Sequence, residues 1–542
     1  MAAKRDPGFS LLRRVASVAL AGLVLLLVRG AGAAGGVSLP GPAATELVAE
    51  LMAAPVGRFL LPEALPDWRE LAAAARAWHP GQAPERSVWI RDTLVCQDGV
   101  SRHFFYRLPA DYDPNHPAPL LLDLHGGVSR EKLLDLGDGD FPEGYLSRWA
   151  TERGLILVVP TGQRGATWWD EIGARHLLRI LRTLKSRLAV DHERVYVTGF
   201  SDGGSGSYFL AQFHPTDFAA FLPQCGHPGC DNWGEPRRQA YFVNLRNRPV
   251  YAINNGQDGL YPAARIHGYL LPAWEADADL RFHSYPDYGH RPDYWEAEQE
   301  RMGAFLDGAC RDPLRPRLTL EGADPVRCDW LEILAVDTTG RFPGEWTDWN
   351  SRTVSDRVVV GFQPDESFQG KGYRVATVMA DSTLPAARLG LRAGDTITAL
   401  GAHKVVSEAT FREAVRRFQA GDSFTLEILR EGRRLRLSDR FNPPQFGWLH
   451  DRTRPSLRVE ASLADNRFDL RASGPGRVAL WLDPRVIDFG REVTVYLEGR
   501  EILRRQLEPD ARLLLEELDR QRDPTRLVAG RLEIDLEAAR TW

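Results

Sequence analysis

Cysteine is scarce in this chain, and its spacing argues against the common structural metal sites. Five cysteines occur among 542 residues, with no CxxC pair and no HExxH motif. A structural zinc site has little support, because such sites use closely paired cysteine and histidine ligands. Two pairs remain candidates for a disulfide in an exported chain, and spacing alone does not fix the connectivity. They are Cys225 with Cys230 and Cys310 with Cys328, which leaves Cys96 over.

Strong net charge and internal repeats are also absent. The formal net charge is -5 and 26% of the residues are charged, so nothing global favours nucleic acid or an anionic membrane surface. No basic stripe interleaved with aromatic residues occurs. No period of about 20 to 50 residues marks a repeat array. The hydrophobic share of 43% is normal for a soluble globular protein.

The N-terminus carries the pattern of a secretory signal. Basic residues precede an apolar run over Val15–Val28, and the small residues Ala31-Gly32-Ala33 follow. The run has 14 residues, whereas a membrane-spanning helix needs about 20. We therefore expect residues 1–33 to be a signal peptide and the chain to be exported, to the periplasm or the extracellular space. An uncleaved N-terminal membrane anchor is the alternative.

The sequence pattern divides the rest of the chain into several units. At about 150 residues per domain, the length predicts roughly three or four domains. Residues 34–85 read as a helical lead-in segment, and residues 86–312 alternate short apolar strands with amphipathic helices. That alternation predicts a doubly wound, mostly parallel α/β sheet covered by helices. Residues 313–356 read as a linker, 357–441 as a separate domain, and 455–542 as a small β-rich module with one helix.

One serine lies between glycines where an apolar strand passes directly into a helix. The segment Gly199-Phe200-Ser201-Asp202-Gly203 follows the strand "RVYV". A nucleophilic hydroxyl must project from the sheet on a sharp turn, and small residues two positions before and after it relieve the crowding. Gly199 and Gly203 therefore mark Ser201 as a candidate nucleophile. A glycine-rich turn of purely structural purpose has the same pattern.

A second glycine-rich turn follows an apolar strand upstream of this serine. The strand "LLLDL" ends in His125-Gly126-Gly127. Acyl transfer needs N–H groups aimed at the developing oxyanion, and a glycine loop lets the backbone approach the substrate carbonyl. We assign the first oxyanion donor to the amide of Gly127, with Gly126 as the near alternative. The second donor is the amide of Asp202, the residue after the serine. An ordinary turn with two glycines is the alternative.

An acid and a base complete the expected constellation. Asp258 and His290 each follow an apolar strand, and the chain order is Ser201, Asp258, His290. Ligands bind at such strand ends in open α/β sheets. His290 would act as general base and then as acid, and Asp258 would orient its imidazole. The rival acids are Asp287 and Asp293, and the rival histidines are His227, His267 and His283.

Together these motifs resemble the α/β-hydrolase superfamily over residues 86–312. The matching segments are "HGG", "GFSDGG", "NGQDGLYP" and "YGHRPDYW". Within it the chain is similar to secreted esterases of the polyhydroxybutyrate depolymerase, feruloyl esterase and dienelactone hydrolase-like group. The resemblance implies a serine hydrolase that needs no metal or organic cofactor. The segment "TGQRGATWWDEIG" is similar to one near the pocket of those esterases, so Trp168 and Trp169 are candidates to stack on a substrate, with a core position as the alternative.

The region 357–441 resembles a bacterial PDZ domain of the type attached to exported proteases. The most specific match is "PAARLGLRAGDTI", residues 385–397. PDZ domains bind extended peptides by adding a strand to a sheet edge. Val360, Gly361 and Phe362 match the hydrophobic-Gly-hydrophobic loop that captures a carboxylate, although a full GLGF is missing. A PDZ fold that serves only as a spacer is the alternative.

The sequence therefore predicts an exported serine hydrolase that cleaves carboxylic esters through a Ser-His-Asp triad and an acyl-enzyme. Its expected partners are a small-molecule or polymer-linked ester, and a peptide or protein C-terminus at the PDZ domain. One alternative is a serine peptidase of the prolyl oligopeptidase type, although no propeller-like repeat occurs. The other alternative is a catalytically inactive α/β-hydrolase scaffold that only binds.

Overall fold

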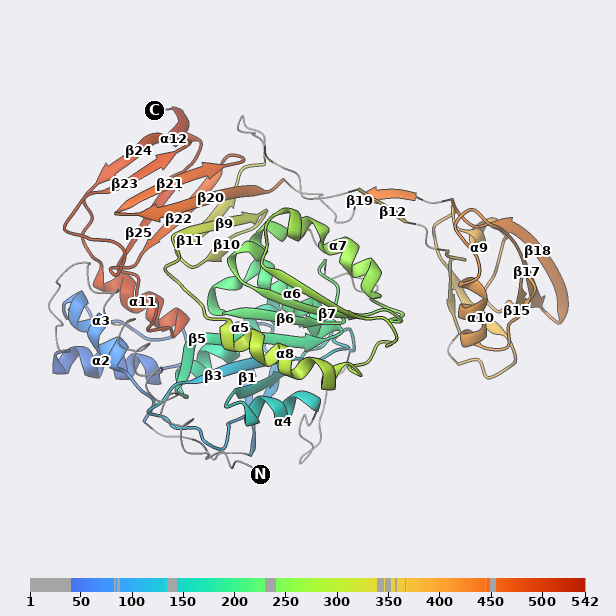
Figure 1. Cartoon of the computed structure of the whole chain (residues 1–542), viewed down its shortest axis with the longest axis horizontal. Helices are drawn as coiled ribbons and strands as arrows, with labels where there is room; N and C mark the ends of the chain where they lie inside the picture. Colours follow the sequence, from blue (N-terminus) through green and yellow to red (C-terminus); the bar gives the residue numbers. More distant parts are fainter. Residues whose placement is uncertain are drawn as a thin grey trace, which may run out of the picture.

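A computed structural model describes most of the chain (Figure 1). Its main regions are the predicted α/β unit, the C-terminal module and the domain that follows residue 357. The first 39 residues, with the predicted signal peptide, lie outside the described part. Within the described part, no helix is long and apolar enough to cross a membrane. The described residues are 40–81, 84, 88–131, 133, 144–229, 240–338, 346, 352–355, 358–365, 367–443, 445–448 and 455–541.

The largest sheet belongs to the predicted α/β unit. Its eight strands run in the order β1-β2-β4-β3-β5-β6-β7-β8. All neighbours from β4 to β8 pair in parallel, and β2 runs antiparallel to both β1 and β4. Every residue of β4 and of β6 is buried, as expected for strands covered on both faces. The strands are β1 (Trp89–Val95), β2 (Ser101–Arg107), β3 (Ala118–Leu124), β4 (Ile156–Pro160), β5 (Val190–Phe200), β6 (Ala220–Gln224), β7 (Val250–Asn255) and β8 (Leu280–Tyr285).

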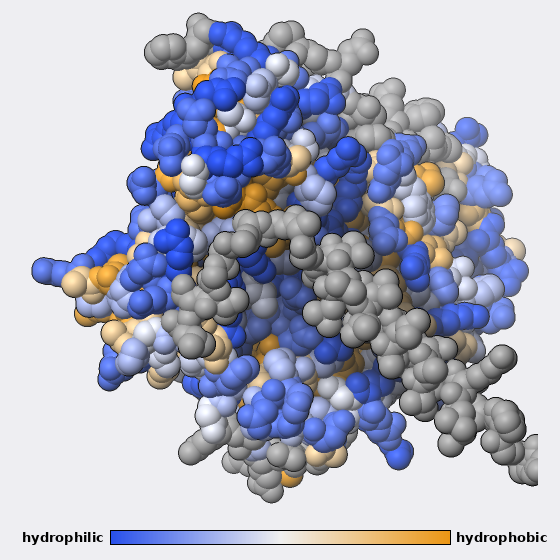
Figure 2. All heavy atoms as spheres, turned by 60° about the vertical axis from the view of Figure 1, so that its left-hand side comes forward, coloured by the Kyte–Doolittle hydropathy of each residue, from blue (hydrophilic) through white to orange (hydrophobic). Residues whose placement is uncertain are grey.

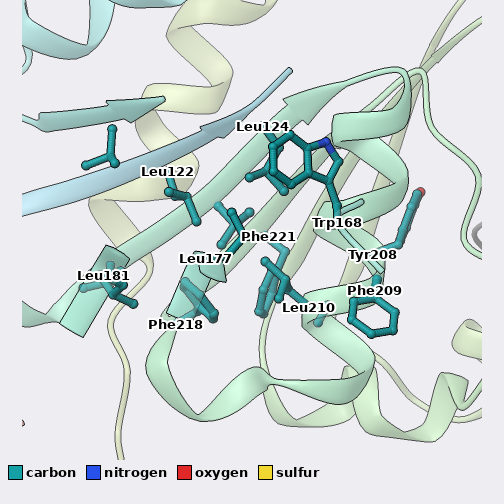
Figure 3. Packing of buried hydrophobic residues seen from close by; sticks show 14 of the residues in the cluster. Leu122, Leu124, Trp168, Leu177, Leu181, Tyr208, Phe209, Leu210, Phe218 and Phe221 are labelled. Atoms are coloured by element: carbon teal, nitrogen blue, oxygen red, sulfur yellow. The ribbon is translucent and has the colours of Figure 1, made fainter. Parts of the chain in front are cut away.

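Helices cover both faces of this sheet, so the predicted doubly wound α/β-hydrolase fold is confirmed. Helices α5 (Glu171–Lys185), α6 (Asp202–Phe213) and α7 (Ala263–Glu275) pack into the larger core cluster. Helices α4 (Tyr145–Glu152) and α8 (Trp295–Gly308) pack into the cluster on the other face. Figure 3 shows Leu177 and Leu181 of α5 beside Phe218 and Phe221. Two 3-10 helices, η1 (Pro215–Asp217) and η2 (Phe242–Asn247), complete this unit.

The C-terminal module is larger than the sequence predicts, because it recruits strands from the predicted linker. Strand β9 (Arg317–Gly322) pairs with β20, and β11 (Leu331–Val336) pairs with β22. The linker prediction over 313–356 is therefore wrong for residues 317–336, whose apolar residues enter the core of this module. Its sheets run β24-β23-β21-β20-β9 and β10-β11-β22-β25. The other elements are β10 (Val326–Cys328), β20 (Leu457–Ala464), β21 (Arg467–Ala472), β22 (Gly476–Leu482), β23 (Val493–Leu497), β24 (Arg500–Arg505), β25 (Gly530–Asp535), α11 (Ala511–Gln521) and α12 (Ala538–Thr541).

The predicted PDZ domain is inserted into this module between β11 and β20. It lies at the end of a two-stranded ribbon, β12 (Arg352–Ser355) paired with β19 (Gln445–Trp448), apart from the rest of the chain (Figure 1). Its sheet runs β13-β14-β15-β17-β18, with β16 on β15. Its elements are β13 (Phe362–Pro364), β14 (Tyr373–Val378), α9 (Pro385–Arg388), β15 (Thr396–Leu400), β16 (His403–Lys404), α10 (Glu408–Val415), β17 (Ser423–Arg430) and β18 (Arg433–Arg440).

The helical lead-in packs on the far end of the chain. Helices α2 (Pro42–Ala53) and α3 (Trp68–Ala77) share a buried apolar cluster with α11. Arg522, which is fully buried, donates to the carbonyls of Leu51 and Ala54. Figure 1 shows the blue helices α2 and α3 beside the red α11. The face shown in Figure 2 is largely hydrophilic, with apolar residues exposed in several places between hydrophilic ones.

Buried charges join the hydrolase unit to the C-terminal module. Asp523 lies 2.7 Å from Arg311 and 3.9 Å from Lys185, and Lys185 lies 3.3 Å from Asp217. We call these four residues the buried charge cluster, because each is at most 3% exposed. Only Asp523 comes from the C-terminal module. Buried ions require partners, so the cluster ties the folding of the two units together.

The cysteines described by the structure are unpaired. Cys96, Cys225, Cys310 and Cys328 are all free thiols, and Cys230 lies outside the described residues. The candidate disulfide between Cys310 and Cys328 is therefore wrong. Cys310 is exposed beside Glu193, whereas Cys328 is buried beside Asp329.

Candidate active site

Ser201 occupies a strained turn between β5 and α6. Its φ of 61° and ψ of -119° are unusual for a residue with a side chain, and such strain is stored where the surrounding structure imposes it. A Cβ on Gly199 or Gly203 would lie 2.5 Å or 1.7 Å from the carbonyl oxygen of Leu124. Both glycines therefore allow the close approach of strand β3 to this turn.

The structure brings Ser201, His290 and Asp258 into one hydrogen-bonded chain. The Oγ of Ser201 lies 2.8 Å from Nε2 of His290, and Nδ1 of His290 lies 2.7 Å from Oδ2 of Asp258. The other carboxylate oxygen of Asp258 accepts the amides of Leu260 and Tyr261 at 2.8 and 2.9 Å. Burial opposes ionisation of Asp258, but the hydrogen bonds from His290 and these amides outweigh it and lower its pKa. Asp258 therefore stays a carboxylate that can orient an imidazole.

Asn255 holds the loop that carries His290, a role that the sequence analysis missed. This residue ends β7 and is fully buried. Its Nδ2 donates to the carbonyls of Gly289 and Arg291 at 2.7 and 2.8 Å, one on each side of the histidine. The hint in the sequence is an amide side chain three residues before Asp258 at a strand end. Asn255 therefore connects the loop that carries Asp258 to the loop that carries His290.

The rival candidates have other surroundings. His283 lies 2.8 Å from Glu298, and His267 packs on Trp274 with ring centroids 4.9 Å apart. His227 packs edge-on against Tyr269 with a centroid distance of 4.6 Å. Asp287 is exposed, and Asp293 forms an ion pair with Arg291 at 3.5 Å.

The glycine loop approaches the nucleophile closely. A Cβ on Gly126 would lie 3.0 Å from Cβ of Ser201 and 3.6 Å from its Oγ. Gly127 has a φ of 71°, which favours glycine. His125 anchors the start of the loop, because its Nε2 accepts the amide of Gly162 at 3.0 Å and its carbonyl accepts Nε1 of Trp168 at 2.9 Å. Burial lowers the pKa of His125, so its ring stays neutral and can accept that amide.

The two tryptophans are core residues. Trp168 is 1% exposed and Trp169 is 4% exposed, and both belong to the larger apolar cluster. Figure 3 shows Trp168 among the side chains of this cluster. The interpretation that they stack on a substrate is therefore wrong. Trp168 instead packs edge-on against His125, with ring centroids 5.1 Å apart, and so supports the glycine loop. The rings that contact His290 are Phe200 and Tyr261, with centroid distances of 4.9 and 5.9 Å.

The described residues contain no group of three or more histidine, cysteine, aspartate or glutamate side chains placed to hold a metal ion. The chain of Ser201, His290 and Asp258 can activate a hydroxyl without one. Such an arrangement is suited to acyl transfer through a covalent serine intermediate.

The predicted peptide-binding loop lies at an edge of the inserted domain. Strand β13 ends the sheet order, with β14 as its neighbour. Gly361 has a φ of 97°, and a Cβ there would lie 2.7 Å from the side chain of Leu384. The carbonyls of Val360 and Gly361 accept amides of residues 386 and 379 at 2.7 and 3.0 Å. Phe362 packs edge-on against Phe411 of α10, so β13 and α10 lie next to each other. An edge strand beside a helix is the geometry that peptide addition requires.

Comparison with known proteins agrees with both units. Residues 359–438 match the PDZ domain family, which confirms the inserted PDZ domain. Feruloyl esterase D of Neurospora crassa is 34% identical over 160 residues, which cover 28% of this chain and 53% of that protein. The bifunctional acetylxylan esterase/xylanase XynS20E of Neocallimastix patriciarum is 27% identical over 180 residues, covering 32% of this chain and 24% of that protein.

Among solved structures, a thermostable esterase matches with a TM-score of 0.34 and 18% identity, covering 41% of this chain and 63% of that one. The chain spans about half the length of the feruloyl esterase and a quarter of the xylanase-containing protein.

Proposed function

We propose that this chain is an exported serine hydrolase that cleaves carboxylic esters, with a PDZ domain that binds a peptide or protein C-terminus. The observation that carries the catalytic part is the hydrogen-bonded chain from Ser201 through His290 to the buried carboxylate of Asp258. The names of the curated relatives support ester substrates, including feruloyl and acetylxylan esters. The N-terminal sequence pattern supports export.

The first half of the reaction acylates the serine. His290 takes the proton of the Ser201 hydroxyl through Nε2 as the oxygen attacks the ester carbonyl. The oxygen that becomes negative is stabilised by the amides of Gly127 and Asp202, where removal of one donor costs about 10²–10³ in kcat. Asp258 holds the imidazole through Nδ1 and stabilises its protonated form. The imidazolium then protonates the leaving alcohol, which departs and leaves an acyl-enzyme.

The second half hydrolyses the acyl-enzyme. A water molecule takes the place of the alcohol, and His290 removes its proton during attack on the acyl carbonyl. Collapse of the second tetrahedral intermediate returns the proton to Oγ of Ser201 and releases the acid. The strained backbone of Ser201 keeps its oxygen at the same position through both halves.

Steady-state hydrolysis of p-nitrophenyl acetate and methyl ferulate tests this proposal. We expect Ser201→Ala to reduce turnover to the residual level of binding and the oxyanion hole, and Asp258→Asn to lower kcat by about 10⁴. Asp287→Asn is the matched control for the acid and should retain wild-type kcat. Unchanged turnover in Ser201→Ala, or a loss confined to Asp287→Asn, would reject the assignment. A peptide p-nitroanilide in the same assay tests the peptidase alternative.

A further inference from the structure

The carboxylate of Asp202 is buried beside the nucleophile and contacts the glycine loop. Asp202 is 6% exposed and begins helix α6 directly after Ser201. Its Oδ2 accepts the amide of Val128 at 2.8 Å. Burial raises the pKa of this carboxyl, while the hydrogen bond from the amide of Val128 favours its charged form. The proposed mechanism uses only the backbone amide of this residue, so the role of its side chain is open.

This contact holds the C-terminal end of the glycine loop, residues 125–128, which we call the oxyanion loop. The near end is anchored at His125 by the amide of Gly162 and the indole of Trp168. Gly126 and Gly127 lie between the anchors and have no side chains of their own to hold them. Glycine is the residue with the largest conformational freedom, so its position depends on what holds its neighbours. The side chain of Val128 is buried in the larger core cluster, and the Asp202 carboxylate adds a direct hold on the backbone amide that follows Gly127.

We propose that the Asp202 side chain is a positioning residue that holds the oxyanion loop against the nucleophile. One residue then supplies the second oxyanion donor through its amide and places the first donor, on Gly127, through its carboxylate. Because Asp202 follows Ser201 directly, the donor loop and the nucleophile share one rigid support, helix α6. This inference rests on the proposed function and extends it.

The geometry predicts a loss in kcat rather than in KM. The oxyanion donors act on charge that develops in the transition state, so a displaced donor weakens the transition state more than substrate binding. We expect Asp202→Ala to lower kcat by about 10²-fold, the cost of one oxyanion donor, with KM within about threefold of wild type. Asp202→Asn keeps one oxygen that can accept the Val128 amide, so it should lose only about tenfold.

The experiment measures kcat and KM for p-nitrophenyl acetate and the Ki of phenylboronic acid in the full-length protein. A serine-bound boronate places an oxygen at the oxyanion position, so its affinity should fall in parallel with kcat. Asp510→Asn is the matched control, because Asp510 also accepts backbone amides, those of Arg512 and Leu513, at the start of α11. It should retain wild-type kcat and boronate affinity. Amide hydrogen exchange over residues 125–130 should be faster in Asp202→Ala.

Two outcomes of the kinetic and boronate measurements would overturn the inference. One is kcat within threefold of wild type in both Asp202 variants, and the other is a loss of kcat without a loss of boronate affinity. If Asp202→Ala does not fold, Asp202→Asn decides alone by the same criteria. A wild-type protein without ester turnover would instead reject the proposed function. Unchanged amide hydrogen exchange over residues 125–130 in the variants would reject the positioning role separately.

Discussion

Removal of the Asp523 carboxylate should destabilise the hydrolase unit and the C-terminal module together. Asp523 is the one member of the buried charge cluster that the C-terminal module supplies, and it faces Arg311 and Lys185. In Asp523→Ala, Lys185 keeps its ion pair with Asp217, whereas Arg311 loses the carboxylate that lies 2.7 Å from it. Breaking a buried ion pair by removing one partner costs about 3–5 kcal/mol, because a charge remains buried without compensation. That is a large share of the roughly 5–15 kcal/mol by which domains are stable.

Thermal and urea unfolding of the full-length chain, followed by tryptophan fluorescence and by ester turnover, measures this effect. At about 2–4 °C per kcal/mol, Tm should fall by on the order of 10 °C, with both signals moving together. Asp307→Ala is the matched control, since Asp307 pairs with Arg153 at the surface and its side chain is 71% exposed. Its loss should stay below about 1 kcal/mol.

A Tm shift in Asp523→Ala no larger than in the control would refute the reasoning. So would a transition in which the C-terminal module unfolds while turnover persists at unchanged temperature, because the cluster would then not couple the two units.

Three further predictions concern pH, packing and the insertion. Burial lowers the pKa of His176 to about 4, so the unfolded chain, with a histidine pKa near 6.5, binds this proton first as pH falls. Stability should therefore decrease between pH 6.5 and 4, less steeply in His176→Gln, and equal slopes would contradict this. Gly203→Ala places a methyl group against strand β3, so it should lower the free energy of unfolding by about 1–3 kcal/mol and kcat at least tenfold. Gly268→Ala is the control, because a Cβ there would have no atom within 4 Å, and it should leave turnover unchanged. Replacing residues 356–444 by Asn-Gly should join the paired strands β12 and β19 into a hairpin. The shortened protein should keep p-nitrophenyl acetate turnover within threefold of wild type. Abolished turnover in a folded protein would place the PDZ domain in the active site.

The hydrogen-bonded chain of the proposed active site was accessible from the sequence because each member has a local signature. Ser201, Asp258 and His290 each follow an apolar strand, and parallel strands bring their carboxyl ends to one edge of the sheet. The fold class follows from the same alternation of strands and helices. The PDZ domain was accessible because "PAARLGLRAGDTI" is one contiguous motif, which folds as helix α9, a turn and the start of strand β15.

Long-range pairing and side-chain environment were not accessible in this way. Strand β9 pairs with β20, as in the contact of Gly322 with Leu457, across an insertion that hides the relation. Short strands among prolines and glycines therefore read as a linker. An indole such as that of Trp168 suits a pocket as well as a core, and only packing distinguishes them. The carboxylate of Asp202 and the amide of Asn255 bind backbone groups, and these partners come from other segments of the chain that only the folded structure brings together.

The central claim is that Ser201 is an activated nucleophile. The most direct measurement is intact-mass detection of a fluorophosphonate adduct on the folded protein, with peptide mapping and Ser201→Ala as control. The account predicts one adduct, on the peptide containing Ser201, and none in the variant. An adduct on another residue, or none on folded wild-type protein, would contradict it.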